Sequence, residues 1–133
     1  MNEVEIATIF AKALDAEDFE TAWGLLAPDC QYASPDGVAV GPDAIVASYR
    51  AHAEWARRNL DEIEYESVIE PGSDGTVRVV YVDRIRKGER RHEYRCRQAL
   101  TVAPLRGIVR IAHEEIDGER DRLRDYFARC GLR

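Results

Sequence analysis

The sequence predicts an α+β domain in which helices close a cone-shaped, curved antiparallel sheet. Three observations support this fold class. Apolar residues recur at helical spacing through most of residues 2 to 60. Strand-like alternation then fills residues 63 to 116, broken only by short turn sequences. Hairpin-length turns make neighbouring strands antiparallel, and helices kept apart from the strands are typical of a two-layer α+β fold.

Three helices are expected in the N-terminal half of the chain. Residues 2 to 15 carry one apolar stripe, and Asn2 with Glu5 fits a capping box. Asp18 can cap a second helix, which Pro28 is expected to end. Short strands at 30–34 and 38–40 should follow. A third helix should then run from the proline at position 42 to about residue 60, because proline favours the first helical turn.

Four strands and one more helix are expected in the second half. The strands should cover residues 63–69, 76–86, 89–103 and 108–116, with a loop from Pro71 to Gly75 and a hairpin tip at Lys87-Gly88. A small residue in the longest strand, Ala99, would let the sheet bend into a cup. Residues 118–133 are expected to form a short helical extension of a single domain spanning residues 1–133.

Composition narrows the classes of protein to which the chain can belong. No apolar run approaches the roughly 20 residues that span a bilayer, and the first ten residues carry acids rather than a basic leader. We therefore expect a cytoplasmic protein without a membrane partner. The formal net charge of −6 disfavours binding to nucleic acid. Three widely spaced cysteines do not suggest a disulfide framework.

Basic residues cluster between positions 84 and 97. They are Arg84, Arg86, Lys87, Arg90, Arg91, Arg95 and Arg97. Acidic residues at 62, 64 and 66 fall on the neighbouring predicted strand, so the two sets should pair across strands on a solvated or subunit-facing surface. The alternative is a patch for an anionic ligand or an acidic protein.

The last predicted strand carries one candidate acid–base pair. Strand alternation places His113 and Glu115 on the same face as Val109 and Ile111. If that face lines a desolvated pocket, an imidazole and a carboxylate there are suited to general acid–base chemistry. Alternatively, both side chains lie at the strand's end, partly exposed to solvent and hydrogen-bonded to a neighbour. A one-residue slip in register would also turn His113 outward.

A second candidate catalytic residue is Asp83, which shares an otherwise apolar strand face with Tyr81. It would act as a pocket base, or else form a structural ion pair with an arginine. Further side chains are expected either to line a pocket or to belong to a plain core: Trp23, Tyr32, Tyr49, His52, Trp55 and Tyr81. The three histidines lack metal-ligand spacing and no nucleotide-binding motif occurs, so no metal and no cofactor are expected.

Three stretches carry a resemblance to a known superfamily. They are AKALDAEDFETAWGLLAPDCQYASPDG, VGPDAIVASYRAH and GIVRIAHEEID. In this order they resemble the paired helices, the glycine-initiated third helix and the final strand of the nuclear transport factor 2-like superfamily. The SnoaL-like polyketide cyclases and ketosteroid isomerase belong to this superfamily.

The resemblance implies a cup whose inner wall carries the working groups. Ketosteroid isomerase uses an aspartate as the base, and a tyrosine and a protonated aspartic acid as its oxyanion hole. A rough alignment places those three positions at Ser34, Phe10 and near Gln98. Steroid-isomerase chemistry is therefore not expected, although Phe10 and Gln98 would still line the cup. SnoaL-like cyclases often carry a histidine and an acid on late strands, where this chain has His113 and Glu115.

Two functions remain open from the sequence. The first is a small-molecule pocket of the SnoaL-like type, with a cofactor-independent isomerase, cyclase or hydrolase-like activity on an apolar or polycyclic ligand. The second is a non-catalytic homodimeric binding or interaction module with a filled cavity. The resemblance implies a homodimer through the outer face of the sheet in either case.

Overall fold

A computed structural model of the chain describes residues 1–72 and 75–132. Positions 73 and 74 of the expected loop therefore lie outside the described residues. The elements follow in the order α1 (Glu3–Asp15), α2 (Phe19–Gly24), β1 (Leu26–Ser34), β2 (Gly37–Val40), α3 (Pro42–Asn59), β3 (Glu62–Pro71), β4 (Thr76–Lys87), β5 (Arg90–Ala103), β6 (Gly107–Glu114) and α4 (Glu119–Arg129).

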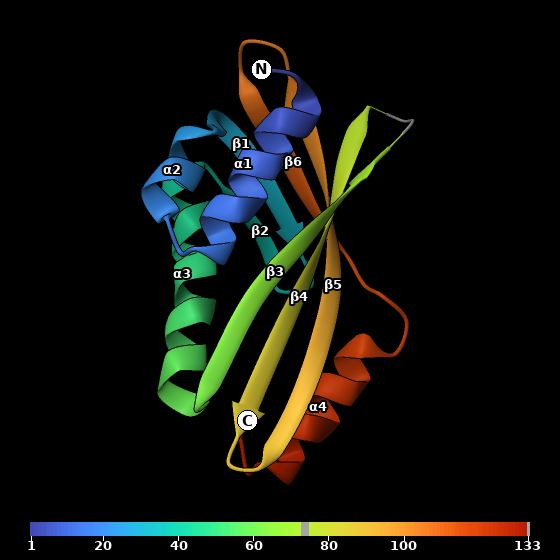
Figure 1. The fold of residues 1–133 in the computed structure, drawn as a ribbon. Coiled ribbons are helices and arrows are strands. Elements are labelled where there is room, and N and C mark those ends of the chain that lie inside the picture. The colour runs from blue at the N-terminus through green and yellow to red at the C-terminus, as the bar shows by residue number, and fades with distance from the viewer. Residues whose placement is uncertain (73–74, 133) are drawn as a thin grey trace.

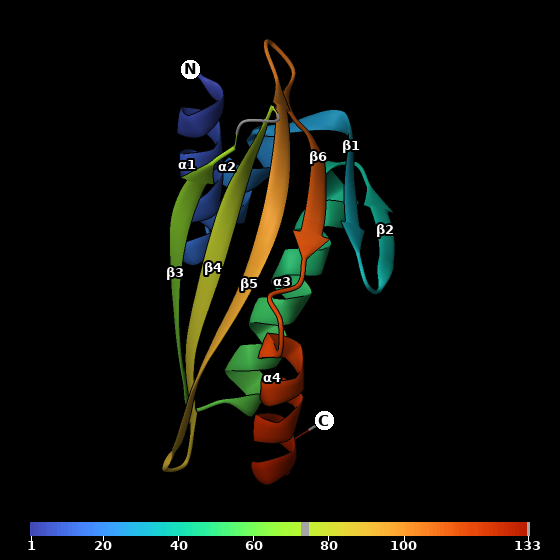
Figure 2. The same cartoon turned by 90° about the vertical axis from the view of Figure 1, so that its right-hand side faces the viewer.

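The strands form one curved sheet in the order β2-β1-β6-β5-β4-β3 (Figures 1 and 2). Antiparallel hairpins join β1 to β2 and link β3, β4, β5 and β6 in turn. In contrast, β1 and β6 run parallel, so the expectation of an all-antiparallel sheet is wrong. The reason is that no hairpin links these two strands. The chain passes through β2, α3, β3, β4 and β5 before β6 returns beside β1.

Three helices lie against the same side of the sheet, and α4 sits at its lower end. Helix α1 packs across β3, β4 and β5, whereas α3 packs on β1 and β2 and reaches β3. Helix α4 follows β6 and lies along β5, beside the C-terminal half of α3 in the view of Figure 2. None of the described helices is both long enough and apolar enough to cross a membrane.

Local sequence signals account for most of the element boundaries. The Asn2 carboxamide oxygen accepts from the Glu5 amide at 2.8 Å, and the reciprocal bond closes the expected capping box of α1. Helix α2 ends at Gly24, so the expectation that Pro28 ends it is wrong. The strand starts earlier because Leu26 pairs with Ile108 of β6. Pro28 falls within the irregular register that follows, where a missing amide hydrogen is tolerated.

A β-bulge changes which residues of β6 face inward. Thr101 pairs with Arg110 and Val102 with Ile108, so Val109 has no opposite residue on β5. Ile108 and Ile111 are both fully buried as a result. The expected alternation from Val109 through Ile111 therefore breaks at Val109 and holds only from Ile111 onward.

Buried side chains fall into two separate clusters. The larger one lies between α1, the start of α3 and the upper sheet, with Phe10, Ile45 and Leu100 fully buried. The smaller one joins the end of α3 to α4 around Tyr126, whose hydroxyl donates to the Arg90 carbonyl at 2.6 Å. The α4 side chains expected to share one face, Leu123, Tyr126 and Phe127, all pack in this smaller cluster.

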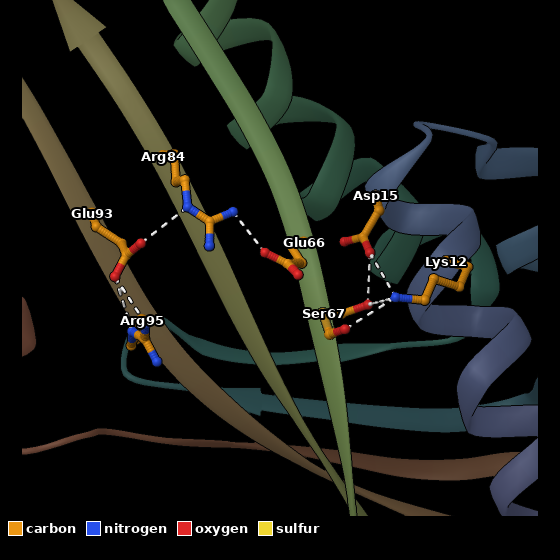
Figure 3. A network of polar contacts seen from close by, with 7 residues as sticks. All are labelled: Lys12, Asp15, Glu66, Ser67, Arg84, Glu93 and Arg95. Atoms are coloured by element: carbon orange, nitrogen blue, oxygen red, sulfur yellow. Dashed lines mark hydrogen bonds and ion pairs between the residues drawn. The ribbon is translucent and has the colours of Figure 1, made fainter.

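The outer face of the sheet carries the expected cross-strand ion pairs. Arg84 bridges Glu66 at 2.6 Å and Glu93 at 3.0 Å, and Arg95 reaches the same Glu93 at 2.9 Å (Figure 3). Arg97 pairs with Glu70 at 3.1 Å. Much of the basic cluster is thus neutralised within the chain. Such solvent-exposed pairs each stabilise the fold by about 1 kcal/mol or less.

Candidate functional site

A cavity of about 440 Å³ lies between the concave face of the sheet, α3 and α4. Some side chains of its wall pack against the larger buried cluster, as Tyr49 does, and others pack against the smaller one, as Phe127 does. The turn between β1 and β2 contributes Ser34 and Asp36 to the lining. The volume falls in the range of small-molecule sites, and the wall is largely aromatic and aliphatic.

The register of three strands places a carboxylate between tyrosines on the cavity floor. Tyr65 of β3, Asp83 of β4 and Tyr94 of β5 lie directly opposite one another, and all three line the cavity. Tyr81 is two residues from Asp83 and therefore points to the same side of the sheet. We call Tyr65, Tyr81 and Tyr94 the tyrosine frame of Asp83.

Asp83 is a partly buried carboxyl group whose side chain has no hydrogen-bond or ion-pair partner among the described residues. Burial raises its pKa to about 7, and the nearby charge of Asp15 contributes to the rise. The structural ion pair considered from the sequence is therefore not formed with any described residue. A carboxyl group with this pKa exchanges protons readily near neutral pH.

Tyr81 supplies an unused hydroxyl next to Asp83. Its oxygen is fully buried and has no hydrogen-bond partner among residues 1–72 and 75–132. Burial raises the pKa of Tyr81 well above its ordinary value, so the phenol stays protonated. A buried hydroxyl without a partner is rare because it forfeits a hydrogen bond to water. The phenol can therefore donate to an oxygen atom of a ligand.

A polar chain of three residues crosses the upper part of the cavity. The Tyr49 hydroxyl donates to Gln98 Oε1 at 2.7 Å, and Gln98 Nε2 donates to the Tyr32 hydroxyl oxygen at 3.0 Å. The rings of Tyr32 and Tyr49 stack with centroids 5.3 Å apart. Burial raises the pKa of Tyr32 to about 12, so it too remains a neutral phenol. Gln98 is thus held in one orientation by two tyrosines.

His113 and Glu115 meet at the edge of the same cavity. Nε2 of His113 lies 3.0 Å from Oε1 of Glu115, and Arg120 at the start of α4 donates to that oxygen at 3.3 Å. The His113 side chain is only 12% exposed, whereas that of Glu115 is 38% exposed. The contacts tie the end of β6 to α4 and place a charged cluster at the rim of the cavity.

Three further cavity carboxylates are each paired with a cation. The pairs are Asp15 with Lys12, Glu17 with Arg57, and Glu115 with Arg120. Asp15 also accepts from the Ser67 hydroxyl at 2.6 Å, and Lys12 donates to the Ser67 carbonyl at 3.0 Å (Figure 3). This network lies on the side of β3 opposite to the Arg84 ion pairs.

Most of the side chains singled out in the sequence lie around this one cavity. They are His52, Trp55, Tyr32, Tyr49, Tyr81, Gln98, Asp83, His113 and Glu115. Phe10 does not line it. Phe10 is fully buried in the larger cluster and packs edge-on against Tyr49 with centroids 6.0 Å apart.

Trp23 lies away from the cavity as well. Its side chain is 49% exposed, and its indole nitrogen donates to Asp43 at 2.8 Å, because the short helix α2 turns this residue toward the start of α3. Sequence reasoning missed Tyr65, Tyr94 and Cys96. The alternation of β3 signals the inward side chain of Tyr65, but nothing in the sequence indicates that Asp83 lies opposite it.

The cavity offers no obvious metal or thiolate chemistry in the part of the chain that the structure describes. No three histidine, cysteine, aspartate or glutamate side chains of the described residues are grouped as metal ligands. Burial raises the pKa of the Cys96 thiol to about 12, which keeps this cavity residue protonated and weakly nucleophilic.

Comparison with known proteins identifies the fold through structure rather than sequence. No protein-family model and no curated protein sequence matches the chain. The structure resembles that of TerC, which was co-crystallized with polyporic acid, with a TM-score of 0.71 and 12% identity over 95% of this chain and 98% of TerC.

Two further solved structures are similar to the chain. One, from Xanthomonas campestris pv. campestris, is provisionally described as a polyketide cyclase and has a TM-score of 0.66 and 14% identity over 95% of this chain and 94% of its own. The other is an NTF2-like protein from Exiguobacterium with a TM-score of 0.65 and 12% identity, covering 84% of this chain and 98% of its own. The expected resemblance is confirmed at the level of fold: this chain has the fold of the nuclear transport factor 2-like superfamily, which includes the SnoaL-like proteins.

Proposed function

We propose that the chain binds an apolar small molecule in the cavity and exchanges a proton with it through Asp83, without a cofactor. The observation that carries this proposal is the unpartnered Asp83 carboxyl, whose pKa of about 7 suits proton transfer near neutral pH. The reaction class is that of an isomerase, a cyclase or a hydrolase-like enzyme.

Asp83 and the nearby Tyr81 would act together in the proposed proton transfer. The Asp83 carboxylate takes a proton from a carbon next to a carbonyl group, and the electron pair of the broken C–H bond moves onto the carbonyl oxygen. That oxygen accepts a hydrogen bond from the Tyr81 hydroxyl, which has no other partner in the described part of the chain. The protonated Asp83 then returns the proton to the same or another carbon. His113 and Glu115 form a second acid–base pair at the rim, available to the far end of a ligand.

Deuterium exchange into an apolar ketone tests this proposal directly. The bicyclic ketone β-tetralone is incubated with the protein in deuterated water, and loss of its α-proton signals is followed by NMR. We expect exchange above the protein-free rate, reduced about 100-fold or more in Asp83→Asn and less strongly in Tyr81→Phe. Asp36→Asn, which alters an exposed carboxyl group of the cavity lining, is the matched control. Equal exchange by wild type and Asp83→Asn would refute the assignment of Asp83.

A homodimer through the outer face of the sheet is a second, separate proposal. Val68, an apolar side chain in the middle of β3, is 51% exposed. Its neighbour across the ladder, Val80, points to the same face but is only 8% exposed, so Val68 is the apolar side chain of this pair that a second copy would cover. Light scattering after size exclusion measures the mass directly. A monomer at high micromolar concentration contradicts this proposal without bearing on the cavity.

A further inference from the structure

Among the described residues that line the cavity, Asp83 is the one carboxylate that is neither exposed nor paired with a cation. The carboxylates Asp15, Glu17 and Glu115 each have a cation, and Asp36 is exposed to solvent. Asp83 is neither exposed nor paired with any described residue. A desolvated carboxylate without a cation is costly, and the cost disappears if a ligand supplies the positive charge.

The surroundings of Asp83 suit a cation in a second, independent way. Tyr65 and Tyr94 flank Asp83 on the adjacent strands, and Tyr81 lies next to it on its own strand. Aromatic rings attract organic cations through their negative faces, most strongly where water is excluded. A carboxylate within the tyrosine frame therefore combines the two features that recognise an ammonium group.

Other ligand charges fit the same place poorly. The cations that line the cavity or pair with its carboxylates, Lys12, Arg57 and Arg120, are already engaged, so an anionic ligand would meet the Asp83 carboxylate without compensation. A neutral ligand would exclude water from Asp83 and favour its protonated, uncharged form, so that no ion pair would form. A cationic group instead supplies the counter-charge that the Asp83 carboxylate lacks among the described residues.

We propose that the cavity takes an apolar ligand carrying an ammonium group, and that Asp83, within the tyrosine frame, is the anion that pairs with this group. The inference rests on the proposed function in that it assumes a ligand in this cavity, and it names the class of that ligand. The ammonium group would lower the pKa of Asp83 and make it a weaker base, whereas a positive charge beside the reacting carbon would stabilise the enolate formed in the proposed proton transfer.

Calorimetric titration with three probes of the same shape tests the inference. Tryptamine, tryptophol and indole-3-acetate share an indole ring and differ in the charge of the side-chain end. At about pH 8 the amine is protonated and Asp83 is ionised. We expect tryptamine to bind wild type at least about tenfold more tightly than tryptophol, and indole-3-acetate to bind most weakly.

Two variants test whether Asp83 is the residue that makes tryptamine bind more tightly than tryptophol. In Asp83→Asn, the ratio of the tryptamine and tryptophol affinities should fall to about one, whereas Asp121→Asn, at an exposed carboxyl group of α4 outside the cavity lining, should keep the wild-type ratio. Tryptophol or indole-3-acetate binding as tightly as tryptamine overturns the inference, as does a preference that survives in Asp83→Asn. Failure of all three probes to bind also overturns it. The proposed function is judged separately by the exchange of β-tetralone, which carries no charge.

Discussion

Replacing Asp83 by asparagine should change how the stability of the protein depends on pH. In the folded chain the pKa of Asp83 is about 7, against 3.8 for an unperturbed aspartate. Between these values the folded state holds a proton that the unfolded state has lost. The free energy of unfolding therefore falls as pH rises through this window, and the penalty is complete above about pH 7.

The magnitude follows from the difference between the two pKa values. At 1.36 kcal/mol per pKa unit, a rise of about three units corresponds to an upper limit of about 4 kcal/mol. Because Asp83 is only partly buried and the site can relax, we expect about 1–3 kcal/mol. Asparagine cannot ionise, so Asp83→Asn should lose this part of the pH dependence and gain on wild type as pH rises from about 4 to 8.

Urea unfolding followed by circular dichroism at several pH values measures this effect. The unpaired amide of Asp83→Asn adds a cost that does not vary with pH, so the slope of the difference between variant and wild type is the decisive quantity. Asp36→Asn, at an exposed carboxyl group, provides the control and should follow wild type closely. If the free energies of unfolding of Asp83→Asn and wild type instead change in parallel across this pH range, the pKa of Asp83 is that of an ordinary aspartate. The raised pKa assigned to Asp83 is then wrong.

Three further changes test the framework that holds the cavity. Gly107 has φ +93°, and a Cβ there would lie 2.5 Å from the Leu25 carbonyl oxygen, so Gly107→Ala should cost about 2–4 kcal/mol in urea unfolding. Leu100 is fully buried, and Leu100→Ala should cost about 2–5 kcal/mol. Tyr126→Phe removes the hydrogen bond to the Arg90 carbonyl, which should cost about 1 kcal/mol and speed amide exchange in α4.

Gly107→Ala and Leu100→Ala each have a matched control. Gly131→Ala introduces a methyl group at φ +73° with open space around it, so it should cost less than Gly107→Ala. Val68→Ala truncates a half-exposed side chain and should cost less than about 1 kcal/mol. Similar costs for the two glycines would mean that the clash at Leu25 is relieved. Unchanged exchange in α4 would show that the Tyr126 bond does not secure that helix.

The sequence alone predicted features that depend on near neighbours in the chain. The capping box at Asn2, the proline that opens α3 and the hairpin tip at Lys87 are each set by a few consecutive residues. The inward side of β4, with Tyr81 and Asp83 on one face, follows from simple alternation. Local sterics and hydrogen bonding act over a few residues, so local sequence is enough to indicate them.

Only the tertiary structure decided features that depend on residues far apart. The parallel pairing of β1 with β6 comes from packing of segments about 80 residues apart, which no local pattern encodes. The place of Asp83 between Tyr65 and Tyr94 needs the register of three strands at once. The lack of a counter-charge at Asp83 is a property of the whole cavity. An ionisable group's pKa is set by everything that surrounds it in space, so the character of this site emerges only when the fold is complete.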